Sequence, residues 1–134
     1  MIKWSGRILV FLGTGHTLLA LALTLADHAG TWFTGVLWGP DEGVITMSQG
    51  MAAYWLTIGS FGPPLVVLGL AVLWTQRRGI VPPAFIGWAL LAWTVCCTVI
   101  LLPSPWILGV IASVLYLVGV RRAAAAERVA AGQN

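Results

Sequence analysis

Charged residues are scarce in this chain. They make up 8% of the 134 residues, while hydrophobic residues make up 59%; an ordinary soluble domain is roughly 25% charged. This composition excludes a soluble globular protein. Cysteine is scarce as well, because Cys96 and Cys97 are the only two. They are adjacent, so they provide neither a disulfide framework nor the paired cysteines of a zinc site.

Long apolar runs take the place of charge. A helix needs roughly 20 apolar residues to cross a hydrocarbon layer of about 30 Å. Four stretches approach or meet that length, and they are residues 8–26, 50–75, 83–102 and 105–121. The sequence therefore predicts an all-α fold, an integral membrane four-helix bundle formed by residues 1–122. We expect residues 123–134 to be a cytoplasmic tail that extends the last helix.

The cations predict how the four spans are oriented. All seven lysines and arginines fall on one side of the predicted membrane, and they are Lys3, Arg7, Arg77, Arg78, Arg121, Arg122 and Arg128. Loops and termini with an excess of lysine and arginine stay in the cytoplasm. We therefore expect a multi-pass protein of the cell (inner or plasma) membrane with both termini inside. The net charge of +3 then reflects orientation and gives no case for a nucleic-acid partner.

One ionisable side chain lies inside the first predicted span. His16 falls near the middle of that span, in the run FLGTGHTLLALAL, at a depth where polar residues are rare and usually face the bundle interior. Positions 16, 20, 23 and 27 follow one helical stripe. Asp27 is therefore expected on the same side, about 16 Å further along at ~1.5 Å per residue.

The second span contains the unusual stretch TIGSFGPP, residues 57–64. Pro63 and Pro64 remove two backbone donors and crowd the carbonyls four residues earlier, so the helix should kink there. Freed carbonyls in hydrocarbon need a side chain, water or ligand as partner. Counting along the spans predicts that four polar side chains share one layer at this depth: His16, Ser60, Thr94 and Ser113.

A purely structural interpretation of these residues stays open. His16 donating to a carbonyl freed by the kink would be structural, and serine or threonine in a span often bonds its own helix. Most of the eight tryptophans fit the aromatic belts at the membrane surfaces. The deeper Trp55 and Trp93, with Tyr54, either pack in the core or form the walls of an apolar cavity.

The predicted outer loop, residues 27–47, is long. A connection of about 20 residues is commonly functional or disordered, and its tryptophans and other apolar residues argue against disorder. We expect this loop to lie in the outer interface or to cover the bundle as a lid. Asp41 and Glu42 would face outward in the first arrangement and cap the pocket of His16 in the second.

No metal or cofactor is expected. His16 and His28 lie twelve positions apart, too far to ligate one metal on a single helix, and no third ligand is evident. Gly13-Thr14-Gly15 lacks the preceding strand and the third glycine of a dinucleotide-binding loop. A lipophilic small molecule remains the expected ligand.

At Gly13–His16, and in the order of four spans with a long first outer loop, the chain resembles a family of small bacterial membrane proteins filed as a domain of unknown function. The resemblance covers most of residues 3–122 and implies a four-helix fold without an activity. The architecture alone is similar to small polytopic membrane terpene cyclases, which use acidic residues on lipophilic substrates. None of their motifs can be matched here residue by residue.

These observations favour an intramembrane pocket for a lipophilic small molecule, with cofactor-free acid–base isomerisation, cyclisation or hydrolysis as its chemistry. General acid–base work needs a proton donor and acceptor in a dry site. The candidate catalytic residues are His16, Asp27, Asp41 and Glu42. The candidate substrate-binding residues are Ser60, Tyr54, Trp55, Trp93, Thr94 and Ser113.

Two alternatives from other classes remain. A small exporter or proton-coupled carrier would use His16 and Asp27 as a relay, and would form a homo-oligomer because four short helices make a thin pathway. A non-catalytic partner subunit would instead bury the small-residue faces of Gly13, Thr17 and Gly109 against another chain, as helices in membranes commonly do.

Overall fold

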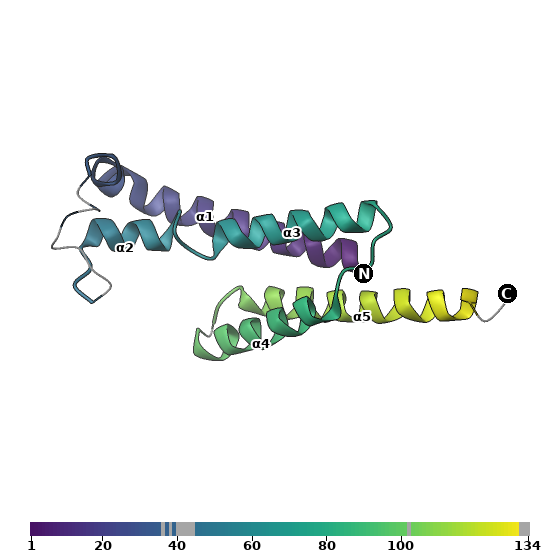
Figure 1. Cartoon of the computed structure of the whole chain (residues 1–134). Helices are drawn as coiled ribbons and strands as arrows, with labels where there is room; N and C mark the ends of the chain where they lie inside the picture. The colour runs from purple at the N-terminus through teal and green to yellow at the C-terminus, as the bar shows by residue number, and fades with distance from the viewer. Residues whose placement is uncertain (36, 38, 40–44, 102, 132–134) are drawn as a thin grey trace. The chain divides into compact units, whose positions relative to one another are not determined.

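The computed structural model describes residues 1–35, 37, 39, 45–101 and 103–131. This described part is all-helical and contains no strand, so the predicted fold class holds at that level. Its five helices, shown in Figure 1, are α1 (Ile2–Phe33), α2 (Gln49–Leu56), α3 (Gly62–Arg77), α4 (Ala84–Ile100) and α5 (Trp106–Ala131).

The first helix is longer than the predicted first span. It has 32 residues, because the stretch from Asp27 to Phe33 contains no proline and continues the helix through residues predicted to be loop. The helix ends before Gly35, whose φ of +79° is a left-handed conformation that glycine adopts without strain. Asp27 and His28 therefore lie on a helix.

The predicted second span is divided into two helices. Ser48 caps α2 by accepting a hydrogen bond from the amide of Met51 at 3.2 Å, and α2 ends at Leu56 after 8 residues. Helix α3 begins at Gly62, which places Pro63 and Pro64 in its first turn, where a missing amide hydrogen costs little. The predicted kink is thus a break over residues 57–61.

The chain forms two compact units. Unit 1 comprises Met1–Leu12 and Leu65–Asn134, and unit 2 comprises Gly13–Pro64, so that α1 contributes to both. In unit 1, Val72 of α3 and Tyr116 and Val120 of α5 form a buried cluster. Partly buried side chains of α1, α4 and the α3–α4 connection pack against it. The Tyr116 hydroxyl donates to the carbonyl of Pro83 at 3.1 Å.

Glycine lets the helices approach closely within each unit. In unit 1, a Cβ at Gly69 would lie 2.7 Å from the carbonyl oxygen of Gly6, so the backbones of α3 and α1 are in contact there. A Cβ at Gly87 of α4 would lie 2.6 Å from Cδ1 of Tyr116 in α5, and these two helices run side by side (Figure 1). In unit 2, Gly62 faces the carbonyl oxygen of Gly13. Such close small-residue contacts are typical of helices that pack in membranes.

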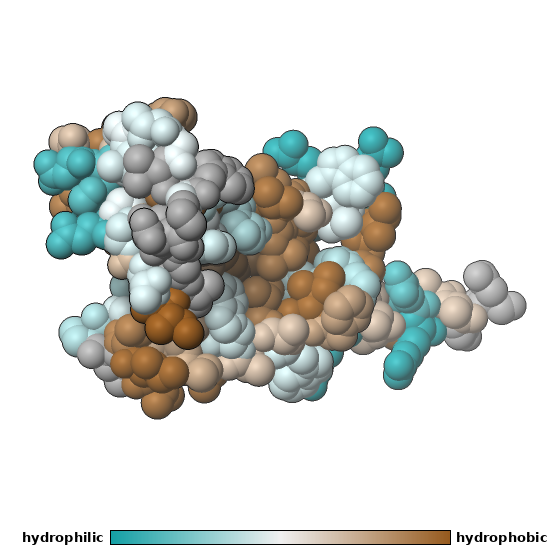
Figure 2. Space-filling view, turned by 60° about the vertical axis from the view of Figure 1, so that its left-hand side comes forward, coloured by the Kyte–Doolittle hydropathy of each residue, from teal (hydrophilic) through white to brown (hydrophobic). Residues whose placement is uncertain are grey.

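Apolar side chains also cover much of the outer surface. Helices α1 and α5 are each long and apolar enough to cross a membrane, and α4 is apolar but shorter. Large side chains such as Phe11, Leu18 and Leu23 are 67%, 60% and 71% exposed. Figure 2 shows hydrophobic residues at the surface, with hydrophilic ones near the C-terminal end of α5. Exposed apolar area on this scale marks a membrane or protein contact surface.

Candidate functional site

The break between α2 and α3 carries the predicted histidine. His16 is half-buried on α1, and its Nε2 lies 3.0 Å from the carbonyl oxygen of Leu56. A carbonyl oxygen only accepts, so Nε2 carries the hydrogen and donates it. The ring also packs on Phe61, with centroids 4.1 Å apart. One side chain of α1 thus contacts the residues on both sides of the turn that separates α2 from α3.

The Leu56 carbonyl is free for His16 because the helix stops there. In an unbroken helix it would accept from the amide of Ser60 four residues later. The Ser60 amide instead bonds the carbonyl of Thr57 at 3.3 Å. The freed carbonyl therefore finds its donor on another helix, forty residues away in the sequence.

Ser60 is engaged within the turn. Its hydroxyl donates to the Thr57 carbonyl at 2.7 Å and accepts from the amide of Gly62 at 3.1 Å, so it caps the start of α3. Thr57 is fully buried, and its hydroxyl donates to the carbonyl oxygen of Ala53 at 2.7 Å. The predicted substrate-binding Ser60 therefore has a structural role in holding the break.

Two aromatic side chains, those of Tyr54 and Trp55, lie next to the break. Tyr54 and Trp55 meet edge to face with centroids 5.9 Å apart. A Cβ at Gly59 would lie 2.9 Å from Cε3 of Trp55 and 3.0 Å from Cε1 of Tyr54, so both rings lie against that glycine. Trp55 is 52% exposed. The break is consequently accessible from its aromatic side.

The other predicted polar pair lies in unit 1. Thr94 and Ser113 are fully buried between α4 and α5, and their oxygens are 3.5 Å apart. Each also donates to its own helix: Thr94 to the carbonyl of Leu90 and Ser113 to that of Gly109, both at 2.8 Å. His16 and Ser60 belong to unit 2, and the layer shared by all four polar residues stays a prediction.

Trp93 is next to this pair in the sequence but packs elsewhere. Its ring meets that of Trp106 nearly edge to face, with centroids 5.0 Å apart. Trp106 is only 7% exposed. Aromatic packing between α4 and α5 accounts for both side chains.

The predicted acidic partners are not brought to His16 within the described residues. Asp27 is exposed on α1, and so is Leu23 on the same stripe, whereas Ala20 on that stripe is buried and His16 is half-buried. The stripe is therefore buried only at its start, towards Gly13 and Leu9, which are also buried. Asp41 and Glu42 lie outside the described residues, together with the centre of the predicted lid.

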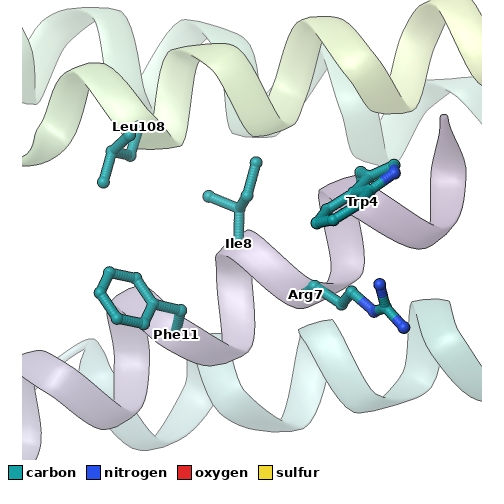
Figure 3. A pocket seen from close by; sticks show the side chains of 5 residues that line it. All are labelled: Trp4, Arg7, Ile8, Phe11 and Leu108. Atoms are coloured by element: carbon teal, nitrogen blue, oxygen red, sulfur yellow. The ribbon is translucent and has the colours of Figure 1, made fainter.

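An apolar groove that the sequence did not reveal lies along the start of α1 in unit 1. Figure 3 shows its lining, Trp4, Arg7, Ile8, Phe11 and Leu108, and its volume is about 330 Å³. A smaller hollow of about 230 Å³ is lined by Met1, Ile2, Lys3, Gln76, Gly119 and Arg122. Neither contains a predicted site residue. Leu108 could not be found by pattern, because only folding brings α5 to α1.

Arginine and tryptophan side chains pair in unit 1. The guanidinium carbons of Arg7, Arg78 and Arg121 lie 5.0, 5.0 and 5.9 Å from the ring centroids of Trp4, Trp74 and Trp88. The first two pairs have helical i, i+3 and i, i+4 spacing, so sequence inspection would have found them. The third joins α5 to α4 and depends on the fold.

A family model matches residues 1–123 of the chain, that of the family of unknown function DUF6463. The chain belongs to this family, and the resemblance noted at Gly13–His16 is confirmed to that extent. Bacterial origin and four membrane spans stay predictions. Neither a curated protein nor a solved structure matches the chain.

Proposed function

We propose that this chain is a four-span protein of the cell membrane, with both termini in the cytoplasm, that binds a lipophilic small molecule at the break between α2 and α3. His16 Nε2 donates to the freed carbonyl of Leu56 at 3.0 Å, which is the structural role expected for this histidine. The observation that carries the binding site is the interruption over residues 57–61, where the ring of Trp55 is 52% exposed and that of His16 is half-buried. In the neutral ring the hydrogen bond to Leu56 leaves Nδ1 as an acceptor.

The proposed topology is supported by where the basic segments lie. The hollow in unit 1 that contains Lys3 also contains Gln76, beside Arg77, and Arg122. The start of α1, the end of α3 and the part of α5 around Arg122 therefore meet in one unit. A tryptophan ring paired with an arginine combines apolar surface with a polar group, and tryptophan is enriched at membrane surfaces for this reason. This arrangement supports one cytoplasmic face.

The proposed ligand enters from the bilayer and presents a hydrogen-bond donor to His16. Broken helices at membrane depth occur where the irregular backbone is buried in protein or lines a cavity, and in transporters they mark binding sites. The exposed ring of Trp55 and the half-buried ring of His16 leave the break open on one side. A lipophilic alcohol or similar molecule satisfies both the apolar wall and Nδ1.

Binding is better supported than catalysis or transport. Acid–base isomerisation, cyclisation or hydrolysis would need a second proton carrier near His16, and Asp27 is eleven positions further along α1. The same separation weakens the His16–Asp27 relay of a carrier. The partner-subunit alternative is less well supported, because residues proposed to contact another chain pack within this one: Gly13 faces Gly62, and Gly109 faces Thr94.

Accessibility of single cysteines tests the topology. In a chain with Cys96→Ala and Cys97→Ala, a membrane-impermeant maleimide should label Ile45→Cys in intact cells. The same reagent should label Ile80→Cys and Ala130→Cys only after the cells are lysed. Labelling of Ile80→Cys in intact cells would overturn the proposed orientation.

A matched pair of photoactivatable probes tests the site. A long-chain alcohol with a diazirine in its chain should label residues 54–61 about fivefold more than its methyl ether, because one hydrogen bond contributes about 1 kcal/mol. His16→Trp retains an indole N–H that can donate to Leu56 but has no acceptor nitrogen, so it should label equally with both probes. If His16→Trp keeps the preference for the alcohol, Nδ1 is not the acceptor.

A further inference from the structure

The groove along the start of α1 has no part in the proposed binding site. Its volume of about 330 Å³ lies at the lower end of the range of about 300–1,000 Å³ that ligand sites occupy. Figure 3 shows Ile8 of α1 and Leu108 of α5 pointing into the space between their helices. Phe11, which also lines the groove, is 67% exposed. The groove is therefore open at the surface and suited to an apolar chain.

A cation lies at one end of this groove. Arg7 is exposed, and its guanidinium carbon is 5.0 Å from the centroid of the Trp4 ring. From Trp4 to Phe11 the helix rises about 10 Å at ~1.5 Å per residue. The polar end thus leads to an apolar lining of several ångströms, formed by Ile8, Phe11 and Leu108. This order, cation first and hydrocarbon beyond, matches a phospholipid headgroup and one acyl chain.

We propose that this groove binds an anionic phospholipid of the cytoplasmic leaflet, with its phosphate at Arg7 and one acyl chain along Ile8, Phe11 and Leu108. Charge complementarity selects the anionic class. Lys3 and Arg122 line a second hollow at the same end of α1, and basic pockets between spans on the cytoplasmic side bind anionic headgroups. The inference rests on the membrane insertion in the proposed function and is independent of His16.

The experiment compares two photoactivatable lipids in nanodiscs that contain the full chain. Phosphatidylglycerol and phosphatidylcholine, each with a diazirine in one acyl chain, are present at equal mole fraction, and crosslinked peptides are mapped by mass spectrometry. We expect phosphatidylglycerol to label residues 8–11 and 107–111 about fivefold more, the preference that one well-placed arginine supplies. Arg7→Gln should remove this preference.

Two further variants separate a specific site from general attraction. Arg128→Gln removes a cation of α5 that does not line the groove, so it should keep the preference. Leu108→Trp keeps every charge and fills the groove, so it should reduce labelling there by both lipids. Equal loss of the preference in Arg7→Gln and Arg128→Gln, or unchanged labelling in Leu108→Trp, would overturn the proposed site.

Extraction at alkaline pH keeps this test distinct from the test of the proposed function. If the chain leaves the membrane in carbonate, membrane insertion fails, and both proposals fail with it. If the chain stays in the membrane and the two lipids label residues 8–11 equally, only the lipid site is overturned.

Discussion

The break between α2 and α3 and the α4–α5 hairpin satisfy their polar groups in opposite ways. In the hairpin, Thr94 and Ser113 donate to carbonyls of their own helices at 2.8 Å, and both helices stay unbroken. At the break, a backbone carbonyl loses its helical donor and receives one from His16 on another helix. A buried hydroxyl is therefore locally satisfied, whereas an interrupted backbone requires a distant side chain.

This difference bears on how polar residues in apolar helices should be interpreted. A hydroxyl that donates to the carbonyl four residues earlier has its hydrogen-bond partner within its own helix, so its presence is weak evidence of a site. A histidine that bridges a break is tied to the tertiary structure, because the donor and the acceptor approach only when two helices pack. Substitutions in the two regions should therefore differ in how much they lower the free energy of unfolding, and in how far that loss depends on a second substitution.

The largest expected effect is in the hairpin. Gly87→Leu would place a side chain where even a Cβ lies 2.6 Å from the buried Tyr116 ring, and overpacking of this kind costs about 3 kcal/mol. Unfolding by sodium dodecyl sulfate in mixed micelles measures the change. Gly15→Leu is the control, because no atom lies within 4 Å of a Cβ at Gly15. Equal losses in both variants would contradict close packing of α4 on α5.

The next effect is at the break. His16→Leu leaves the carbonyl of Leu56, a residue that is 51% exposed, without its donor, and loss of one hydrogen bond costs about 1 kcal/mol. The same unfolding assay should show His16→Gln closer to the unsubstituted chain than His16→Leu, because the amide can donate to that carbonyl. If both variants are equally stable, the hydrogen bond contributes nothing to the fold.

A double-mutant cycle sharpens the origin of the break. With Pro63→Ala and Pro64→Ala, α2 and α3 can join, and the Leu56 carbonyl can accept from the Ser60 amide. His16→Leu should then cost less, with a coupling free energy of about 1 kcal/mol, within the range seen for residues that share a network. Additive free energies would show that the prolines are not what keeps the carbonyl free.

The smallest effect is expected at the buried hydroxyl pair. Thr94→Val removes a hydroxyl that bonds its own helix and lies 3.5 Å from Ser113. Interhelical hydrogen bonds in membrane proteins average about 0.6 kcal/mol, so the free energy of unfolding should fall by about that amount. A loss as large as that in His16→Leu would mean that the two regions do not differ as described.

The prolines and the histidine show what could be predicted at the candidate site. Pro63 and Pro64 indicated an interruption, because two residues without amide hydrogens cannot continue a helix, and residues 57–61 form that interruption. The partner of His16 was anticipated only as a freed carbonyl. Sequence could not name Leu56, since the choice among freed carbonyls depends on how the turn folds. Nor could spacing show that Asp27 is exposed, since the same stripe of α1 is buried at Ala20 and exposed at Leu23.

Hydropathy, helical period and the missing amides of proline are local properties, and from them the helical fold class, the apolar helices and an interruption at Pro63 and Pro64 could be predicted, although the interruption was expected as a kink within one helix. The sequence by itself also determined the position of each cation along the chain. That Thr94 and Ser113 meet, and that they do so in a unit different from that of His16 and Ser60, depends on contacts between helices far apart in the sequence. The groove of Ile8 and Leu108 arose in the same way. Contacts between distant segments depend on which small-residue helix faces pack together. Because several faces in this chain have nearly the same composition, the sequence does not specify which of them meet.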